Sequence, residues 1–123
     1  MAIVLSAIIG SLVLALSGCS DQSGQTEKTL RVGVITYSQD DPFINALTDE
    51  LKAHLKTMES EERRIIVSIK SGNDDQQEQN EKVEEMIDAG CDVLCVNLVD
   101  RTAPYRIIRM ARNENIPVIF FNR

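Results

Sequence analysis

The segment Leu30-Arg31-Val32-Gly33-Val34-Ile35-Thr36, with Asp41 and Pro42 a few residues later, decides the fold of this chain. Residues 30–36 are largely apolar and rich in β-branched side chains, which is typical of a strand buried on both faces. Asp41 and Pro42 predict the start of a helix, because an Asp side chain caps free backbone N–H groups and proline loses no hydrogen bond at the first helical position. The pattern therefore predicts a buried strand that leads into a helix.

The helix that starts at Pro42 is predicted to be amphipathic, with its apolar residues on one stripe at a spacing of about four. The stripe comprises Phe43, Leu47, Leu51 and Leu55, joined by Ile44 and Met58. Further strands are predicted over residues 64–69, 92–96 and 116–121. Between them we expect a helix that buries Val83, Met86 and Ile87 and stops at Gly90, and another helix over residues 102–113.

This alternation implies a parallel sheet with right-handed crossovers and helices on both faces. We therefore predict the α/β class: a single Rossmann-like lobe over residues 29–123, built on a four-stranded parallel sheet. Ligands of such sheets bind beyond the carboxyl ends of the strands, so the loops after the strands are the place to look for a site. A sheet that stops at four strands also leaves an apolar edge near residues 119–121, which invites pairing with another strand.

The first 18 residues carry no charged side chain and form an apolar run that ends in small residues. This is the pattern of a secretory signal sequence, and at about 15 residues the run is shorter than the ~20 that a spanning helix needs. Leu16-Ser17-Gly18-Cys19 resembles the bacterial lipobox, which implies cleavage before Cys19 and acyl chains on that residue. Residues 19–28 would then form a flexible lipidated tether on the extracytoplasmic face of the cell membrane. Since no Lys or Arg precedes the run, we expect the true start codon upstream.

Composition excludes several classes of function. The 13 Lys and Arg against 19 Asp and Glu give a net charge of -6, without the basic surface that nucleic acid binding requires. Neither a Walker A string nor the dinucleotide-binding glycine pattern follows any predicted strand.

The single histidine, His54, lacks ligands at metal-binding spacing, and we expect no metal site. Cys91 and Cys95 would lie about 13 Å apart along a strand, too far for a disulfide, and are predicted to be buried thiols. No catalytic constellation emerges, so we do not expect an enzyme.

Three side chains near the predicted strand ends suit a polyhydroxylated ligand. A carboxylate accepts hydrogen bonds from neighbouring hydroxyls, an amide donates and accepts, and an aromatic ring covers the apolar C–H face of a pyranose. Asp41, Asn97 and Phe43 supply these groups in turn. Because Asp41 is also a predicted helix cap and Phe43 also fits the helix core, the residues alone leave both roles open.

Several motifs of the chain together resemble those of one family. They are Arg31-Val32-Gly33-Val34, Tyr37 with Asp40-Asp41-Pro42-Phe43, Asn73-Asp74, Val96-Asn97-Leu98-Val99-Asp100, and Pro117-Val118-Ile119-Phe120-Phe121-Asn122-Arg123. With them, residues 30–123 look like the N-terminal lobe of the periplasmic galactose/glucose-binding proteins, the sugar receptors of ABC importers within the ribose-binding-protein-like group.

That resemblance implies a monosaccharide ligand, galactose or glucose, and an ABC permease as partner. It implies that Asp41 binds sugar hydroxyls and that Phe43 stacks on a pyranose face. Asn97 would bind a further hydroxyl, and Tyr37 would line the cleft. Members of the family have two lobes, and the second lobe carries the opposing aromatic residue and a calcium-binding loop. The resemblance thus implies a truncated half-receptor with no cofactor of its own, whose one-sided cleft binds sugar weakly.

Two other classes share the strand and helix alternation. A phosphoryl-accepting receiver domain would use Asp40 and Asp41 to hold Mg²⁺ and Asp100 as the phosphorylated residue. Against it, a fifth strand and a late lysine are missing, and an exported protein would meet no cytosolic phosphodonor. A sugar-responsive repressor would need an N-terminal helix-turn-helix, but the apolar run over residues 1–18 occupies that position.

Overall fold

The structure, a computed structural model, describes residues 27–122. Strands and helices alternate in the order β1 (Lys28–Thr36), α1 (Pro42–Thr57), β2 (Arg63–Ser71), α2 (Gln76–Asp88), β3 (Val93–Val96), α3 (Tyr105–Asn113) and β4 (Val118–Phe120). The strands form a four-stranded sheet in the order β2-β1-β3-β4, and each neighbouring pair runs parallel. The predicted α/β class with a parallel sheet is confirmed.

The predicted signal sequence over residues 1–18, the lipidation of Cys19 and residues 19–26 of the predicted tether lie outside the described residues. In the part of the chain that the structure describes, no helix is both long enough and apolar enough to cross a bilayer.

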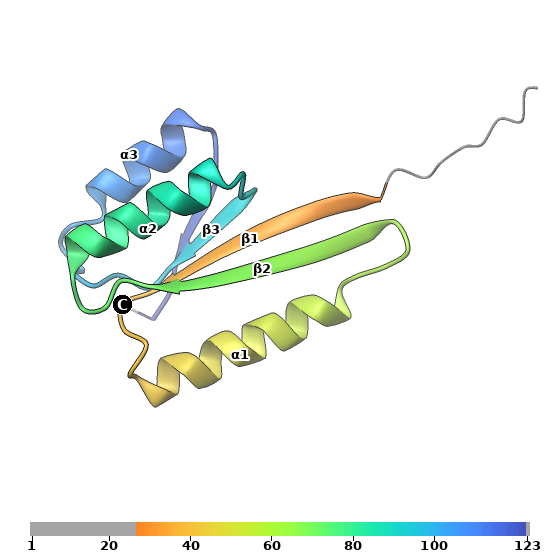
Figure 1. The fold of residues 1–123 in the computed structure, drawn as a ribbon, viewed down its shortest axis with the longest axis horizontal. Helices are drawn as coiled ribbons and strands as arrows, with labels where there is room; N and C mark the ends of the chain where they lie inside the picture. Colours follow the sequence, from red (N-terminus) through yellow and green to blue (C-terminus); the bar gives the residue numbers. More distant parts are fainter. Residues whose placement is uncertain (1–26, 123) are drawn as a thin grey trace, which may run out of the picture.

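Helices cover both faces of the sheet, as predicted. Figure 1 shows α1 on one side of the sheet and α2 with α3 on the other. Because successive side chains of a strand point to opposite faces, β1 contributes to two cores. Ile35 packs with residues of α2, α3 and β3, whereas Val32 and Val34 pack on the side of α1, together with Leu51 and Leu55.

The start of α1 is as predicted, but part of its predicted apolar stripe is exposed. Asp41 is the N-cap and Pro42 is the first helical residue. Ile44 and Thr48 are the buried residues of the helix, whereas Phe43 is 63% exposed, so the prediction that Phe43 belongs to the core stripe is wrong. With 3.6 residues per turn, a step of four residues rotates the side chain by about 40°. Phe43 and Leu47 therefore lie outside the buried face of α1, and only Leu51, further along the same row, lies beside it.

The remaining elements differ from the prediction mainly at their ends. The helix α2 buries Val83 and Met86 as predicted, and the chain leaves it at Gly90, whose φ of 76° suits a residue without a Cβ. The helix α3 starts at Tyr105 instead of residue 102, because Asp100 accepts hydrogen bonds from the backbone and the hydroxyl of Thr102 and holds it in a turn.

Candidate functional site

The carboxyl ends of β1, β3 and β4 are held together by one side chain, that of Asn97. Its Oδ1 accepts a hydrogen bond of 3.3 Å from the backbone N–H of Tyr37, and its Nδ2 donates one of 3.1 Å to the carbonyl of Phe121. The Asn97 side chain is 0% exposed. The structure thus places Asn97 under the candidate site, where its amide joins three strand ends.

Tyr37 and Asp41 lie in direct contact in the loop between β1 and α1. The Tyr37 hydroxyl donates a hydrogen bond of 2.6 Å to Asp41 Oδ2. The other carboxylate oxygen, Oδ1, accepts from the backbone N–H groups of Phe43 and Ile44, at 2.8 and 3.2 Å. Both oxygens are therefore held in place by protein donors, two at Oδ1 and Tyr37 at Oδ2.

Phe43 follows Asp41 in the first turn of α1 and presents an exposed aromatic ring. An exposed ring beside a fixed carboxylate can cover the apolar face of a bound ring while the carboxylate accepts from its hydroxyls. Of the four residues predicted for the site, the structure brings Tyr37, Asp41 and Phe43 together near the surface. Asn97 joins them through the Tyr37 backbone and not through an exposed amide.

Sequence reasoning missed Gln79, which organises the same edge of the sheet. Its side chain is 0% exposed, and its Nε2 donates to the carbonyls of Thr36 and Asn97, at 3.3 and 2.9 Å. Its Oε1 accepts from the backbone N–H of Val99 at 3.0 Å. A signal was available, because Gln79 lies four residues before Val83 and so shares the buried face of α2.

The loops after β1 and β2 are also joined. Ser38 donates a hydrogen bond of 2.8 Å from its hydroxyl to Asp74 Oδ2, and the Asp74 backbone N–H donates to the carbonyl of Tyr37 at 2.7 Å. Asn73 and Asp74 have φ values of 50° and 60°, a conformation that Asn and Asp adopt more readily than most residues. These contacts fix the loop that carries Tyr37 against the end of β2.

The acidic residues do not form the magnesium site of a receiver domain. Among residues 27–122, no group of three or more His, Cys, Asp and Glu side chains could hold a metal ion. Asp41 caps α1, and the hydrogen bonds from Thr102 hold the pKa of Asp100 below its usual value. Nothing in this geometry favours Asp40, Asp41 and Asp100 as a phosphoryl-accepting set.

Cys91 and Cys95 are both free thiols, the first buried and the second half-buried. Burial raises the pKa of each thiol, so both are poor nucleophiles at neutral pH.

Comparison with known proteins identifies the family to which the chain belongs. The family described as "Periplasmic binding protein domain" matches residues 32–123. The chain therefore belongs to this family of solute-binding proteins.

Two of the following relatives are named with a sugar, and one is named as a solute-binding protein. The chain is 34% identical over 97 residues to the D-galactose/methyl-galactoside binding periplasmic protein MglB of Haemophilus influenzae, covering 76% of this chain and 27% of the relative. A solute-binding protein of an ABC transporter from Mycobacterium smegmatis, solved with glycerol, matches with a TM-score of 0.67 and 28% identity over 78% of this chain and 32% of its own. A carbohydrate transporter solute-binding protein from Chloroflexus aurantiacus, solved with D-glucose, matches with a TM-score of 0.64 and 26% identity over 78% of this chain and 27% of its own. The chain thus spans about a quarter to a third of the length of these relatives.

Proposed function

We propose that residues 29–123 act as the N-terminal lobe of an extracytoplasmic receptor that binds galactose or glucose for an ABC importer. The observation that carries this proposal is the fixed Asp41 carboxylate, held by Tyr37 and by the first turn of α1, beside the exposed ring of Phe43. The names of the relatives, which include a galactose-binding protein and a protein solved with D-glucose, support the same class of ligand.

In the proposed complex, the sugar lies on the carboxyl end of the sheet over the start of α1. Asp41 accepts a hydrogen bond from a sugar hydroxyl at Oδ2, the carboxylate oxygen that does not cap the helix. The Tyr37 oxygen, whose proton is donated to Asp41, accepts a hydrogen bond from another hydroxyl, and Phe43 covers a C–H face of the pyranose. Because the carboxylate is already held in place, little conformational entropy is lost when the sugar binds.

The proposed contact with Asn97 needs a rearrangement of the strand ends. Its amide binds Tyr37 and Phe121 and is 0% exposed, so a sugar hydroxyl reaches it only when the segments that cover it move apart. Asn97 therefore contributes to the site mainly by holding Tyr37 in position. A lobe that contacts the sugar from one side leaves much of it in water, and we expect weak affinity.

The test is saturation-transfer NMR of the chain with galactose and with glucose, a method suited to weak binding. The decisive variant is Asp41→Asn, since asparagine caps a helix about as well as aspartate but lacks the negative charge. Its matched control is Asp40→Asn, which removes the neighbouring, exposed carboxylate. We expect saturation transfer to both sugars in the wild type and in the control, and its loss in Asp41→Asn.

The aromatic contact is tested in the same way. Phe43→Leu should lose transfer to the C–H protons of the sugar, whereas Tyr105→Leu, which removes an aromatic residue that is 73% exposed on α3, should not. No transfer in the wild type, or equal effects in the variant and its control, would contradict the proposed site.

We also propose that Cys19 carries acyl chains that attach the lobe to the membrane. The support is the Leu16-Ser17-Gly18-Cys19 motif after an uncharged apolar run. The test is the intact mass of the native product from the membrane fraction of the producing cells. A mass that includes acyl groups on a chain beginning at Cys19 is expected, and an unmodified Cys19 would overturn the anchor without affecting the sugar site.

A further inference from the structure

Two glutamines of α2 hold the loop that follows β3. The Oε1 atom of Gln79 accepts a hydrogen bond of 3.0 Å from the backbone N–H of Val99. The Oε1 atom of Gln76 accepts one of 2.8 Å from the next backbone N–H, that of Asp100. Since Gln76 and Gln79 lie three residues apart, their side chains leave the same side of the helix. The loop after β3 is therefore attached to α2 at two consecutive backbone groups.

Gln79 also fixes Asn97, the residue that begins this loop. Its Nε2 donates a hydrogen bond of 2.9 Å to the Asn97 carbonyl, while the Asn97 N–H donates one of 2.8 Å to the carbonyl of Ile35 in β1. The backbone of Asn97 is thus bound from α2 on one side and from β1 on the other. Because Asn97 is 0% exposed, its side chain has few directions open to it once the backbone is fixed.

A row of three hydrogen bonds leads from Gln79 to the carboxylate of the proposed sugar site. The first is that from Gln79 to the Asn97 carbonyl. The second, of 3.3 Å, runs from the Tyr37 N–H to Asn97 Oδ1, and the third, of 2.6 Å, from the Tyr37 hydroxyl to Asp41 Oδ2. Gln79 is itself 0% exposed, so it can influence a bound sugar only through Asn97 and Tyr37.

The chemistry of these contacts requires an amide at position 79. An amide donates to a carbonyl and accepts from an N–H at the same time, which neither an aliphatic side chain nor a carboxylate can do. The side chain is also confined by the loop after β2, since a Cβ at Gly72 would lie 2.7 Å from Gln79 Cβ. Its position and its hydrogen bonds are therefore both fixed by the surrounding fold.

We propose that Gln79 is a positioning residue of the sugar site, because it fixes Asn97 and thereby the Tyr37 hydroxyl that binds Asp41. This inference rests on the proposed function. Groups that bind a ligand must be held to within about 0.5 Å by the residues behind them. Loss of the Gln79 amide therefore weakens sugar binding even in protein that remains folded.

The first experiment needs no sugar. Hydrogen exchange, followed by NMR, compares the Tyr37 amide with that of Val34 in the middle of β1, for the wild type, Gln79→Leu and Val83→Ala. Val83 is the matched position, because it is buried on the same helix four residues later and its truncation leaves a cavity without removing a hydrogen bond. A general loss of stability speeds exchange at both amides, whereas release of Tyr37 speeds exchange at that amide alone.

Relative to Val34, the Tyr37 amide should exchange about tenfold faster in Gln79→Leu than in the wild type, as loss of one hydrogen bond implies. In Val83→Ala this ratio should not change. Equal ratios in the two variants overturn the proposal.

The second experiment measures saturation transfer to galactose and to glucose in the same three proteins, at a temperature where circular dichroism shows each to be folded. We expect transfer in the wild type and in Val83→Ala, and its loss in Gln79→Leu. Undiminished transfer in Gln79→Leu overturns the proposal. Absence of transfer in the wild type overturns the sugar site itself, and the exchange experiment then decides alone whether Gln79 positions Tyr37.

Gln79→Glu provides a test that does not depend on the folding of Gln79→Leu. Protonated, its carboxyl can still donate to the Asn97 carbonyl and accept from the Val99 N–H, whereas the ionised form has no donor. Ionisation would bury a charge facing the carbonyls of Thr36 and Asn97, which raises the pKa of this carboxyl.

The measurement on Gln79→Glu is saturation transfer from about pH 5 to about pH 9, with the wild type as the reference at each pH. The variant should match the wild type at the acidic end and lose transfer as the pH rises. A variant that follows the wild type throughout overturns the proposal, as does one that lacks transfer at every pH while the wild type retains it.

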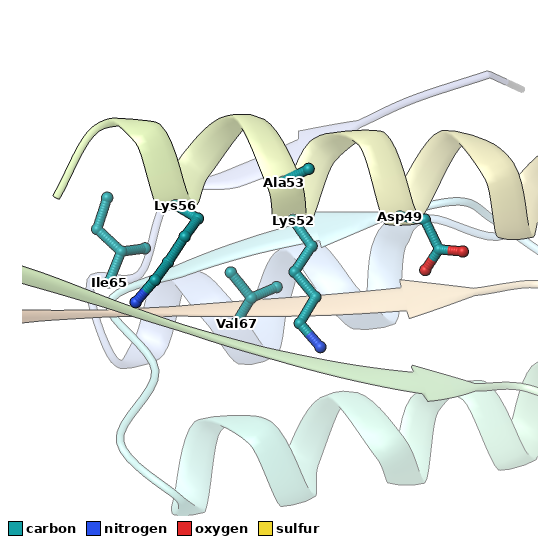
Figure 2. Close-up of a pocket in the computed structure, with 6 residues that line it drawn as sticks. All are labelled: Asp49, Lys52, Ala53, Lys56, Ile65 and Val67. Atoms are coloured by element: carbon teal, nitrogen blue, oxygen red, sulfur yellow. The ribbon is translucent and has the colours of Figure 1, made fainter.

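A groove elsewhere on the lobe supplies the control for where the sugar binds. It measures about 490 Å³ and lies between α1 and β2, with Ile65 and Val67 on the strand side. Figure 2 shows the side chains of Lys52 and Lys56 extending from α1 toward this strand. Ammonium groups also bind hydroxyls, so Lys52→Ala is measured with the other variants. Transfer should be unchanged in Lys52→Ala, and its loss there together with its retention in Gln79→Leu would overturn both the proposed site and the role of Gln79.

Discussion

The hydroxyl of Tyr37 donates a hydrogen bond of 2.6 Å to Oδ2 of Asp41, four residues further along the chain. The same carboxylate caps α1 through Oδ1, so one side chain links the end of β1 to the start of the helix. This double use explains why substitution of Asp41 by alanine cannot separate a binding role from a structural one. Tyr37 offers the cleaner separation, because its hydroxyl can be removed without loss of the helix cap.

Tyr37→Phe should lower the free energy of unfolding by about 1.5–3 kcal/mol, the range of a hydrogen bond to a charged group. The helix cap stays intact, so the circular dichroism spectrum should not change. Urea denaturation measures the effect. Tyr105→Phe is the control, since that ring is 73% exposed, and an equal loss of stability in both variants would contradict the role assigned to the Tyr37 contact.

Gln79→Leu should destabilise the lobe by about 3 kcal/mol, because each buried backbone group left without a partner costs about 1–3 kcal/mol. The Asn97 carbonyl loses its donor and the Val99 N–H loses this acceptor, whereas the Thr36 carbonyl keeps its hydrogen bond from the Gly72 N–H. The control is Gln77→Leu, at an exposed position of the same helix. If urea denaturation gave the two variants equal stability, the side chain of Gln79 would not be what holds these loops.

Gly72→Ala should destabilise the lobe by about 1–3 kcal/mol, as overpacking of a filled site usually does. A Cβ at residue 72 would lie 2.7 Å from Gln79 Cβ and 3.3 Å from the Gln79 Cα, so the start of α2 would have to move. Gly33→Ala is the matched comparison, since its nearest neighbour, at 3.1 Å, is the flexible end of Leu94. We expect a larger loss of thermal stability for Gly72→Ala, and the reverse order would refute this account.

Acid should weaken the fold in part through Glu85. The hydrogen bond from Lys70, followed by that from Lys82, holds the pKa of Glu85 below its ordinary value of 4.5. A carboxyl whose pKa is lower in the folded state stabilises that state above its unfolded pKa, and this contribution is lost as the pH falls through the folded pKa. Glu85→Gln should therefore reduce stability at pH 7 but not at a pH well below 4.5.

Thermal unfolding of the wild type and of Glu85→Gln across this pH range is the measurement. The side chains are exposed, so the difference should be small and should shrink as salt is added. A difference that stays constant down to the lowest pH would show that the charge of Glu85 is not responsible.

The fold was predictable because its signals are local. The β-branched run before Thr36, the Asp41 cap with Pro42 and the stop at Gly90 each act within a few residues of their own position. The sheet follows from them, since alternating strands and helices have few ways to pack. The exposed position of Phe43 was not predictable from a spacing of four residues, because such a row drifts around the helix.

The polar part of the site was predictable only as a set of residue types. Asn97 binds the backbones of Tyr37 and Phe121, which lie 60 and 24 residues away in the sequence. Gln79 likewise binds carbonyls and an N–H of other elements. No local pattern shows that an amide will be buried to satisfy backbone groups of distant segments, so a polar residue on an otherwise apolar helix face is the one clue that the sequence offers.

The strand pairs become shorter from one side of the sheet to the other, and this asymmetry affects Asn97. β1 and β2 run together over 9 residues each, whereas β3 has 4 residues and β4 has 3. Since β1 and β2 pair over more residues than β1 and β3, the amide hydrogens of β2 and β1 should exchange with solvent after those of β3. The hydrogen bond from Asn97 to Phe121 lies on this readily opened side, and that to Tyr37 on the more stable side. Of its two hydrogen bonds, we expect that from Asn97 Nδ2 to Phe121 to open before that from the Tyr37 N–H.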